Sequence, residues 1–365
     1  MKKTRPIVVA PSRRVYALLL VVAAGLLWLL AQPRPGVRIV HLKPAVAPAA
    51  GAEARPVPDR IRIASYNLEN FTDGRGDGPE RTPERFVAQA RGAAEIVAEA
   101  QPDILLLQEV ENARVLVFLN DQLDDPFDYI YVTDFRRSSG ARDKLNLGVL
   151  SRLKPKRVRQ LGFQALRGAG RPARGILSAS FDLGNDTTLL TYNIHLKSNF
   201  GLAERNHAQR GIALHLLGAD FFSEVYRSYP RTTATLVLGD TNVDPDSESF
   251  AADPSLEPLA GSFADLWLGR PIEERTTIPT RQAGNTNLVF PPSAFDRAFA
   301  SKNLVDSGPW RVTDPVSIQR GTATHDNTLL PGVDGHVSDH YLVHLDLIRV
   351  AEDAPAPIPE TGEEE

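Results

Sequence analysis

The sequence contains no cysteine, so it can form neither a disulfide nor a thiolate metal site, and this absence fits any cellular compartment. Neither sign of charge is in large excess, because 41 Lys and Arg residues stand against 45 Asp and Glu residues, a net charge of −4. Bulk charge therefore gives no support for a protein that binds polyanions by charge alone. The hydrophobic fraction of 42% over 365 residues is enough for a substantial core, in one large domain or two small ones.

A long uncharged apolar run occurs at the N-terminus, from Val15 to Ala31, after a basic segment formed by residues 1–14. The run is about as short as a membrane-spanning helix can be, yet longer than most signal-peptide cores, and no small-x-small cleavage site follows it directly. We therefore predict an uncleaved signal anchor with its basic end in the cytoplasm and the rest of the chain outside. The alternatives are a cleaved secretory peptide and, least favoured because the run is apolar all round, a buried soluble helix.

The rest of the chain divides into three parts by composition. Residues 32–59 are rich in Pro and Ala without a helical period, which predicts an extended tether. Residues 351–365 are acidic and contain Pro, which predicts a disordered tail. The basic segment carries five positive charges, the tether a net two positive charges and the tail six negative charges, which leaves the folded part, residues 60–350, near −5.

Helical and strand patterns alternate within this folded part. Apolar residues at helical spacing predict a helix over Pro83–Ala100, with Thr82 as its cap, and a long amphipathic helix over Glu204–Arg227. Strands are predicted over Ile61–Tyr66, Asp103–Glu109, Leu147–Leu150, Ile176–Phe181, Leu189–Leu196, Leu236–Leu238, Ala294–Ala300 and His340–Leu347. Most of these strands fall in two batches, so we predict an α/β (α+β) fold with two sheets packed together and flanked by helices.

The apolar strand Leu236–Leu238 ends abruptly at Gly239, and Asp240 and Asn242 follow it. In an extended chain residues two apart point to the same side, so one carboxylate and one amide would share a space at a strand end. Such an end is a typical ligand site in a layered α/β protein. The alternative is an ordinary turn, for which Gly, Asp, Thr and Asn are suitable residues.

Three other predicted strand ends carry similar polar side chains, which are Asn67, Glu109 and the pair Asp339 and His340. Each one alone is compatible with a cap or a turn. Together, carboxylate and amide oxygens without thiolates suit a hard cation such as Mg²⁺ or Mn²⁺. An Asp beside a His is useful where a phosphate must be held and a proton moved.

Two further strand patterns contain charged or titratable residues. His195 and Lys197 share one face of a predicted strand, which suits the binding of an anionic oxygen, although a solvated sheet face is the alternative. Asp296 interrupts an apolar strand, where an unpaired carboxylate would be costly, so it needs a partner. We predict that this partner is a histidine that the carboxylate orients.

Six short motifs in this order resemble the endonuclease/exonuclease/phosphatase superfamily, and the resemblance covers residues 60 to 350. They are Ser65-Tyr66-Asn67-Leu68-Glu69, Leu107-Gln108-Glu109-Val110, Asn193-Ile194-His195-Leu196-Lys197, Gly239-Asp240-Thr241-Asn242, Phe295-Asp296-Arg297 and Ser338-Asp339-His340. Each motif is weak alone, whereas the ordered set is specific. The resemblance implies a four-layer sandwich in which two mixed sheets lie between helices.

The resemblance also implies roles for the motif residues. Glu109 would be the main metal ligand, with Asn67 and Asp339 close to the ion, which would be Mg²⁺ or Mn²⁺. Asp240 would position or deprotonate the attacking water, and His340, oriented by Asp296, would touch the scissile phosphate. Asn242 and His195, with Lys197 beside them, would hold phosphate oxygens. The implied reaction is in-line attack of water on a phosphoester by a monomeric enzyme.

Some positions depart from the better-known members of the superfamily. Asn146 stands where several nucleases place Tyr or Arg, Arg297 stands where many relatives carry Tyr, His or Ile, and the role of Glu69 is open. The substrate class stays open as well, with a nuclease or other phosphodiesterase favoured. The alternatives are a sphingomyelinase-like or phospholipase-like enzyme at a membrane surface and a catalytically inactive binding protein on the same fold.

Overall fold

The computed structural model describes residues 36–76, 78–137, 139–228, 232–282, 289–323 and 329–350. The basic segment, the predicted anchor and the acidic tail lie outside these residues. Within the described ranges, no helix has both the length and the apolar character that crossing a membrane requires.

The described part of the chain contains helices, strands and single helical turns. In chain order they are β1 (Arg38–His41), β2 (Arg60–Phe71), α2 (Pro83–Ala100), β3 (Ile104–Val110), α3 (Ala113–Asn120), β4 (Tyr129–Val132), β5 (Asn146–Ser151), β6 (Pro155–Gly162), β7 (Ile176–Gly184), β8 (Thr187–His195), α4 (Ala203–Ser228), β9 (Thr232–Asp240), the 3-10 turns Glu248–Phe250 and Pro254–Leu256, α5 (Glu257–Ala260), β10 (Phe263–Asp265), α6 (Ile272–Arg275), β11 (Arg281–Gln282), β12 (Val289–Phe290), β13 (Asp296–Ser301), the π-helical turn Asn303–Ser307, β14 (Trp310–Val312), β15 (Val316–Ile318) and β16 (Leu342–Arg349).

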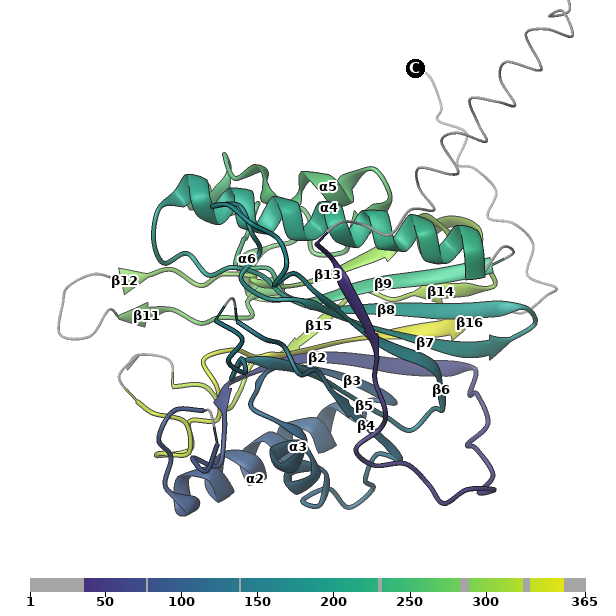
Figure 1. The fold of residues 1–365 in the computed structure, drawn as a ribbon, viewed down its shortest axis with the longest axis horizontal. Helices are drawn as coiled ribbons and strands as arrows, with labels where there is room; N and C mark the ends of the chain where they lie inside the picture. Colours follow the sequence, from purple (N-terminus) through teal and green to yellow (C-terminus); the bar gives the residue numbers. More distant parts are fainter. Residues whose placement is uncertain are drawn as a thin grey trace, which may run out of the picture.

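The strands form two large mixed sheets. Sheet I has the order β1-β6-β7-β8-β9-β13-β10, and sheet II has the order β14-β16-β2-β3-β5-β4 with β15 against β16. In each sheet one central pair is parallel, β8 with β9 and β2 with β3, and the other pairs are antiparallel. Helices α4 and α5 cover the outer side of sheet I, and α2 and α3 cover the outer side of sheet II (Figure 1). The predicted four-layer sandwich is confirmed.

The central strands of the two sheets are apolar almost throughout. In β2, Ile61 and Ile63 face sheet I, whereas Ala64 and Tyr66 pack against α2. Both faces of such a strand are buried, so its sequence is a continuous apolar run and lacks a polar face. Helix α2 begins where the sequence predicts, because the side chain of Thr82 accepts a hydrogen bond from the Arg85 amide and Pro83 occupies the first turn.

The domain begins earlier than the predicted residue 60. Strand β1, within the predicted tether, pairs antiparallel with β6 at the edge of sheet I. Further along, Val46 forms a bridge with Ile130, and the Arg55 guanidinium lies 2.7 Å from a carboxylate oxygen of Asp128. Backbone pairing to an edge strand needs no particular side chains, so a segment rich in Pro and Ala gave no strand signal.

The end of β9 is shaped by Gly239, which has a φ of 134°. A Cβ at this position would lie 2.1 Å from the carbonyl oxygen of Ile194 on the parallel neighbour β8. Only glycine fits this close approach, which brings the last residues of β8 and β9 side by side.

The chain that follows β9 is fixed by a buried cluster of charges. Asp244 is fully buried and forms ion pairs with Arg275 and with Arg297, whose guanidinium lies 3.3 Å from it. Arg297 also lies 2.7 Å from Asp265, so its position in the superfamily motif serves the fold rather than the site. The cluster joins the segment after β9, which carries Asn242, to β10, α6 and β13.

We expect Arg297→Met to destabilise the fold by about 3–5 kcal/mol, because it leaves the Asp244 carboxylate buried beside fewer cations. Urea denaturation followed by circular dichroism measures the change. The control is Lys156→Met, which removes an ion pair with Asp182 whose side chains are 45% and 61% exposed, and it should cost about 1 kcal/mol or less. Equal stability losses in the two variants would show that the buried cluster does not support the fold.

Candidate active site

The predicted site residues gather at one end of the sandwich, where β2, β3, β8 and β9 end and where β13 and β16 begin (Figure 1). Strand pairing explains the arrangement within sheet I, because His195 of β8 and Asp296 of β13 are both in register with Asp240 of β9. In sheet II, Asn67 of β2 is in register with Gln108 of β3, next to Glu109. Three neighbouring strands therefore present three titratable side chains at one level.

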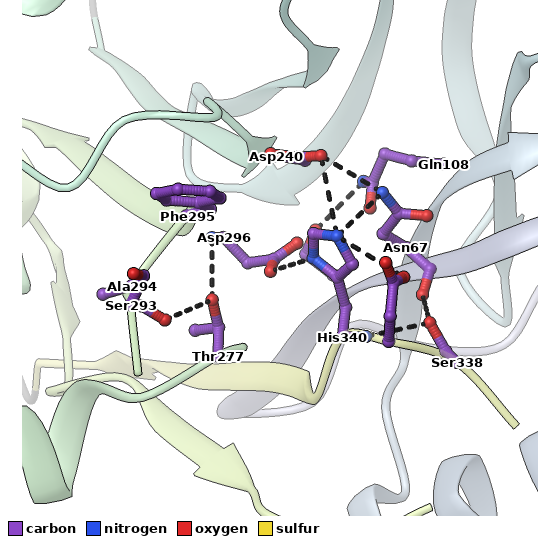
Figure 2. Close-up of polar contacts among 12 residues, drawn as sticks. Asn67, Gln108, Asp240, Thr277, Ser293, Ala294, Phe295, Asp296, Ser338 and His340 are labelled. Atoms are coloured by element: carbon purple, nitrogen blue, oxygen red, sulfur yellow. Dashed lines mark hydrogen bonds and ion pairs between the residues drawn. The ribbon is translucent and has the colours of Figure 1, made fainter. Parts of the chain in front are cut away.

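His340 connects the two sheets at this end. Its Nδ1 lies 2.6 Å from Oδ2 of Asp296, which is the contact that the sequence predicts for the buried carboxylate. Its Nε2 lies 3.4 Å from the side-chain nitrogen of Asn67 and 3.9 Å from Oδ2 of Asp240. Figure 2 shows the imidazole between these three side chains, with Ser338 holding the backbone of His340 from below.

The charges around His340 decide its protonation. Burial disfavours the charged ring, but the carboxylates of Asp296 and Asp339 outweigh burial and hold the pKa of His340 well above its usual value. The ring is therefore an imidazolium at neutral pH, with Nδ1–H donated to Asp296. A cation fixed in this way suits contact with a phosphate oxygen.

The carboxylate of Asp240 is buried beside the His340 ring. Burial raises its pKa to about 7, against the opposing positive charge of His340. One oxygen, Oδ1, accepts a hydrogen bond of 2.8 Å from the backbone amide of Asn242, and Oδ2 accepts one of 3.2 Å from the side-chain nitrogen of Asn67. A carboxylate with a pKa near 7 is suited to accept a proton at neutral pH.

His195 lies between Asp240 and Glu109, with Nε2 3.4 Å and 3.6 Å from their carboxylate oxygens. Burial, followed by the positive charges of Arg174 and His340, lowers the pKa of His195 well below its usual value. A neutral imidazole in this place can donate a hydrogen bond to an oxygen without adding a charge.

The site offers side-chain oxygens for the divalent cation that the resemblance implies. Burial and then the negative charge of Asp339 raise the pKa of Glu109, as expected where carboxylates share a site without a compensating cation. No three Asp, Glu or His side chains among the described residues enclose a metal ion by themselves. Mg²⁺ is commonly held by only one or two carboxylates together with waters and phosphate oxygens. Glu109, Asp339 and the Asn67 amide therefore fit such an ion.

Lys197 lies differently from the prediction, and the structure shows the contacts of Asn146, whose role the sequence left open. Strand β8 ends at His195, so Lys197 does not continue its face. The Lys197 ammonium turns to the following loop and donates to the carbonyl oxygens of Ser198 and Phe200, each at 2.7 Å. Asn146 is buried and its amide binds backbone groups of Glu111 and Phe135, so it fixes a loop and does not replace the Tyr or Arg of other members.

Three residues at the site had no local signal in the sequence. His336 holds Glu69, with 2.8 Å between the Nε2 of His336 and the Oε2 of Glu69. Arg281 of β11 donates to Oδ2 of Asp339 at 2.7 Å. Arg174 donates to the carbonyl oxygen of Leu196 at 3.0 Å. Each comes from a loop or short hairpin whose position depends on tertiary packing.

The backbone at the strand ends is unusual. Four site residues other than glycine have a positive φ, which are Glu69 at 43°, Asn70 at 53°, Asn242 at 55° and Glu109 at 60°. Such conformations cost free energy and persist where the surrounding structure imposes them, as at active sites. At Glu109 a hydrogen bond of 2.8 Å from the backbone amide of Asn70 to the Glu109 carboxylate offsets part of this cost.

Solved structures of other proteins have a fold similar to that of this chain. No curated protein sequence matches the chain. A truncated TDP2 from Caenorhabditis elegans has 16% sequence identity and a TM-score of 0.53, over 79% of this chain and 98% of that one. An endonuclease/exonuclease/phosphatase family protein from Leptotrichia buccalis has 15% identity and a TM-score of 0.50, over 79% and 99%. At these identities the likeness shows the fold alone.

The sequence comparison with protein families is more direct. The model of the Endonuclease/Exonuclease/phosphatase family matches residues 64–340, which include every site residue described above. With the fold and the ordered motifs in agreement, the chain belongs to the endonuclease/exonuclease/phosphatase family.

Proposed function

We propose that the protein is a Mg²⁺- or Mn²⁺-dependent phosphodiesterase that acts on nucleic acid outside the cytoplasm. The observation that carries the proposal is the contact of the His340–Asp296 pair with Asp240. It places a cationic ring and a carboxylate with a pKa of about 7 within 3.9 Å of each other. A scaffold that only binds a partner has no need for two groups of this kind, with matched protonation states, in one buried site.

Each group of site residues has a separate role in hydrolysis. Asp240 accepts the proton that the attacking water loses as its oxygen bonds to phosphorus, while the bond from phosphorus to the leaving oxygen breaks. His340 and the side-chain amides of Asn67 and Asn242 donate to the phosphate oxygens on which negative charge develops. Glu109, Asp339 and Asn67 would hold the divalent ion, which supplies positive charge to the phosphate and the leaving oxygen when bound. Asp296 acts through His340 and is a positioning residue.

Nucleic acid is the favoured substrate because two arginines, Arg174 and Arg281, lie at the site although the domain is negative overall. Arg281 contacts Asp339, and Arg174 binds the backbone next to His195. Local charge of this kind attracts a phosphate-rich chain where bulk charge does not. A screen of the purified chain with Mg²⁺ against plasmid DNA, RNA, sphingomyelin and inositol phosphates separates this substrate from a phospholipid.

We expect Glu109→Gln to retain the fold and to lose about 10²-fold or more of the Mg²⁺-dependent turnover, because the swap keeps the shape and removes a ligand charge. Turnover of bis(p-nitrophenyl) phosphate is measured over a Mg²⁺ titration, and Mg²⁺ binding is measured by calorimetry. The control is Glu99→Gln on α2, whose carboxylate is half-exposed and pairs with Arg320. Full activity of Glu109→Gln at limiting Mg²⁺ would reject the metal assignment.

We expect Asp296→Asn and His340→Ala each to depress turnover strongly, while the double variant is little worse than the worse single one. The two residues act as a unit, because Asp296 sets the tautomer and charge of His340. A double-mutant cycle on the turnover number measures the coupling. Fully additive losses would mean that the residues work independently, and normal turnover in His340→Ala would move the binding-protein alternative to first place.

The location of the domain is a separate part of the proposal. We expect an alkaline phosphatase reporter at the C-terminus of the full chain to be active, because the basic segment precedes the uncharged run Val15 to Ala31. The control lacks residues 1–31 and should give an inactive reporter. An inactive reporter on the full chain would contradict the proposal, and release of all the protein into the medium would support cleavage instead of anchoring.

A further inference from the structure

The loop between β8 and α4 exposes two apolar side chains at the rim of the site. Phe200 is 87% exposed and Leu202 is 77% exposed, the highest values among the large hydrophobic residues that the structure describes. A single exposed apolar residue needs no explanation. An aromatic ring exposed this far, five residues after the site residue His195, is a candidate for contact with a substrate.

The loop backbone is fixed, so the ring is presented from a defined place. The Lys197 ammonium donates to the carbonyl oxygen of Phe200 at 2.7 Å. The Asn199 side chain donates to the carbonyl oxygen of Asn242 at 3.0 Å, which ties the loop to the site itself. The buried Arg210 donates to the Asn199 side chain and to the carbonyl oxygen of Lys197, both at 3.0 Å.

The surroundings of the loop are positive. Burial and then the charges of Arg174, Arg210 and Arg205 lower the pKa of Lys197, which places these cations around the loop. Arg210 is paired with Asp253 at 2.5 Å, whereas Arg205 is exposed in the first turn of α4. Arg174 and Arg205 both act on Lys197, which binds the carbonyl oxygen of Phe200, so they place positive charge near this loop.

We propose that Phe200 stacks on an unpaired base of a nucleic acid strand whose phosphates contact Arg174 and Arg205 on the way to the site. The inference rests on the proposed function and adds the form of the substrate. Aromatic side chains next to cations bind single strands in this way, and every base has a face to stack on. In a duplex that face is covered by neighbouring bases, so the geometry favours a single strand or a frayed end.

The same features could serve a lipid surface, which also offers phosphates and apolar groups. Binding to a bilayer is driven by burial of apolar area. Two apolar side chains on a short loop held by hydrogen bonds offer little such area. Stacking of the Phe200 ring on one base accounts for both the exposure of the ring and the positive charge near the loop. We therefore assign the loop to nucleic acid and make the lipid surface an outcome of the test.

The test compares two substrates of one enzyme, a short single-stranded oligonucleotide and bis(p-nitrophenyl) phosphate, which has no base. We expect Phe200→Ala to raise KM for the oligonucleotide by about fivefold or more, beyond any change with the small diester, because stacking on one base is lost. Phe200→Trp should restore KM, and Phe200→Leu, which is apolar without an aromatic face, should not. The matched control is Phe222→Ala, which removes a ring that is 56% exposed, about 28 Å along α4 from its first residue.

The possible outcomes are distinct. An unchanged oligonucleotide KM in Phe200→Ala, or wild-type KM in Phe200→Leu, would overturn the stacking assignment while the proposed function stands. Loss of co-sedimentation with phosphatidylglycerol vesicles, with an unchanged oligonucleotide KM, would assign the loop to a membrane. A wild-type enzyme that cleaves the small diester and no oligonucleotide would refute the nucleic acid substrate and this inference together.

Discussion

The structure depends on a polar seam between the two sheets at one end of an otherwise apolar interface. Along most of their length the sheets meet through aliphatic side chains such as Ile63 and Leu238. At the site end, polar side-chain contacts cross between them, among them Asn67 with Asp240, Gln108 with Asn193, and His340 with Asp296. Buried polar groups are costly unless they are paired, so these contacts fix the relative position of the sheets as well as the groups themselves.

The seam also explains the unusual protonation of the site. Asp240 and Glu109 are buried near other carboxylates, and burial raises the pKa of both. His340 and Arg281 supply positive charge next to Asp296 and Asp339, with which they pair. The divalent cation that we propose would add positive charge beside the remaining carboxylates.

The sequence was informative wherever the chemistry is local. Helix α2 begins at the predicted cap Thr82, and the polar residues after the apolar strands do meet in one place, because strand ends of one sheet lie at one edge. Prediction failed where the position of a residue depends on distant partners. Strand β1 pairs through its backbone alone, and His336 reaches Glu69 from a loop far along the chain. The pattern of alternating faces failed at Lys197, because β8 ends two residues earlier.

In the function that we propose, catalysis and substrate selection are carried by different parts of the chain. The reacting groups lie at strand ends in register, so the sheets set their separations and a change in a loop cannot move them far. The rim consists of loops, which tolerate substitution and can adapt to different phosphodiesters. The contact of Asn199 with the backbone of Asn242 is the point where the two meet. Through that contact, a group bound at Phe200 and a phosphate bound at Asn242 would be held at a fixed separation, so the loop can select a substrate by its length as well as by its charge.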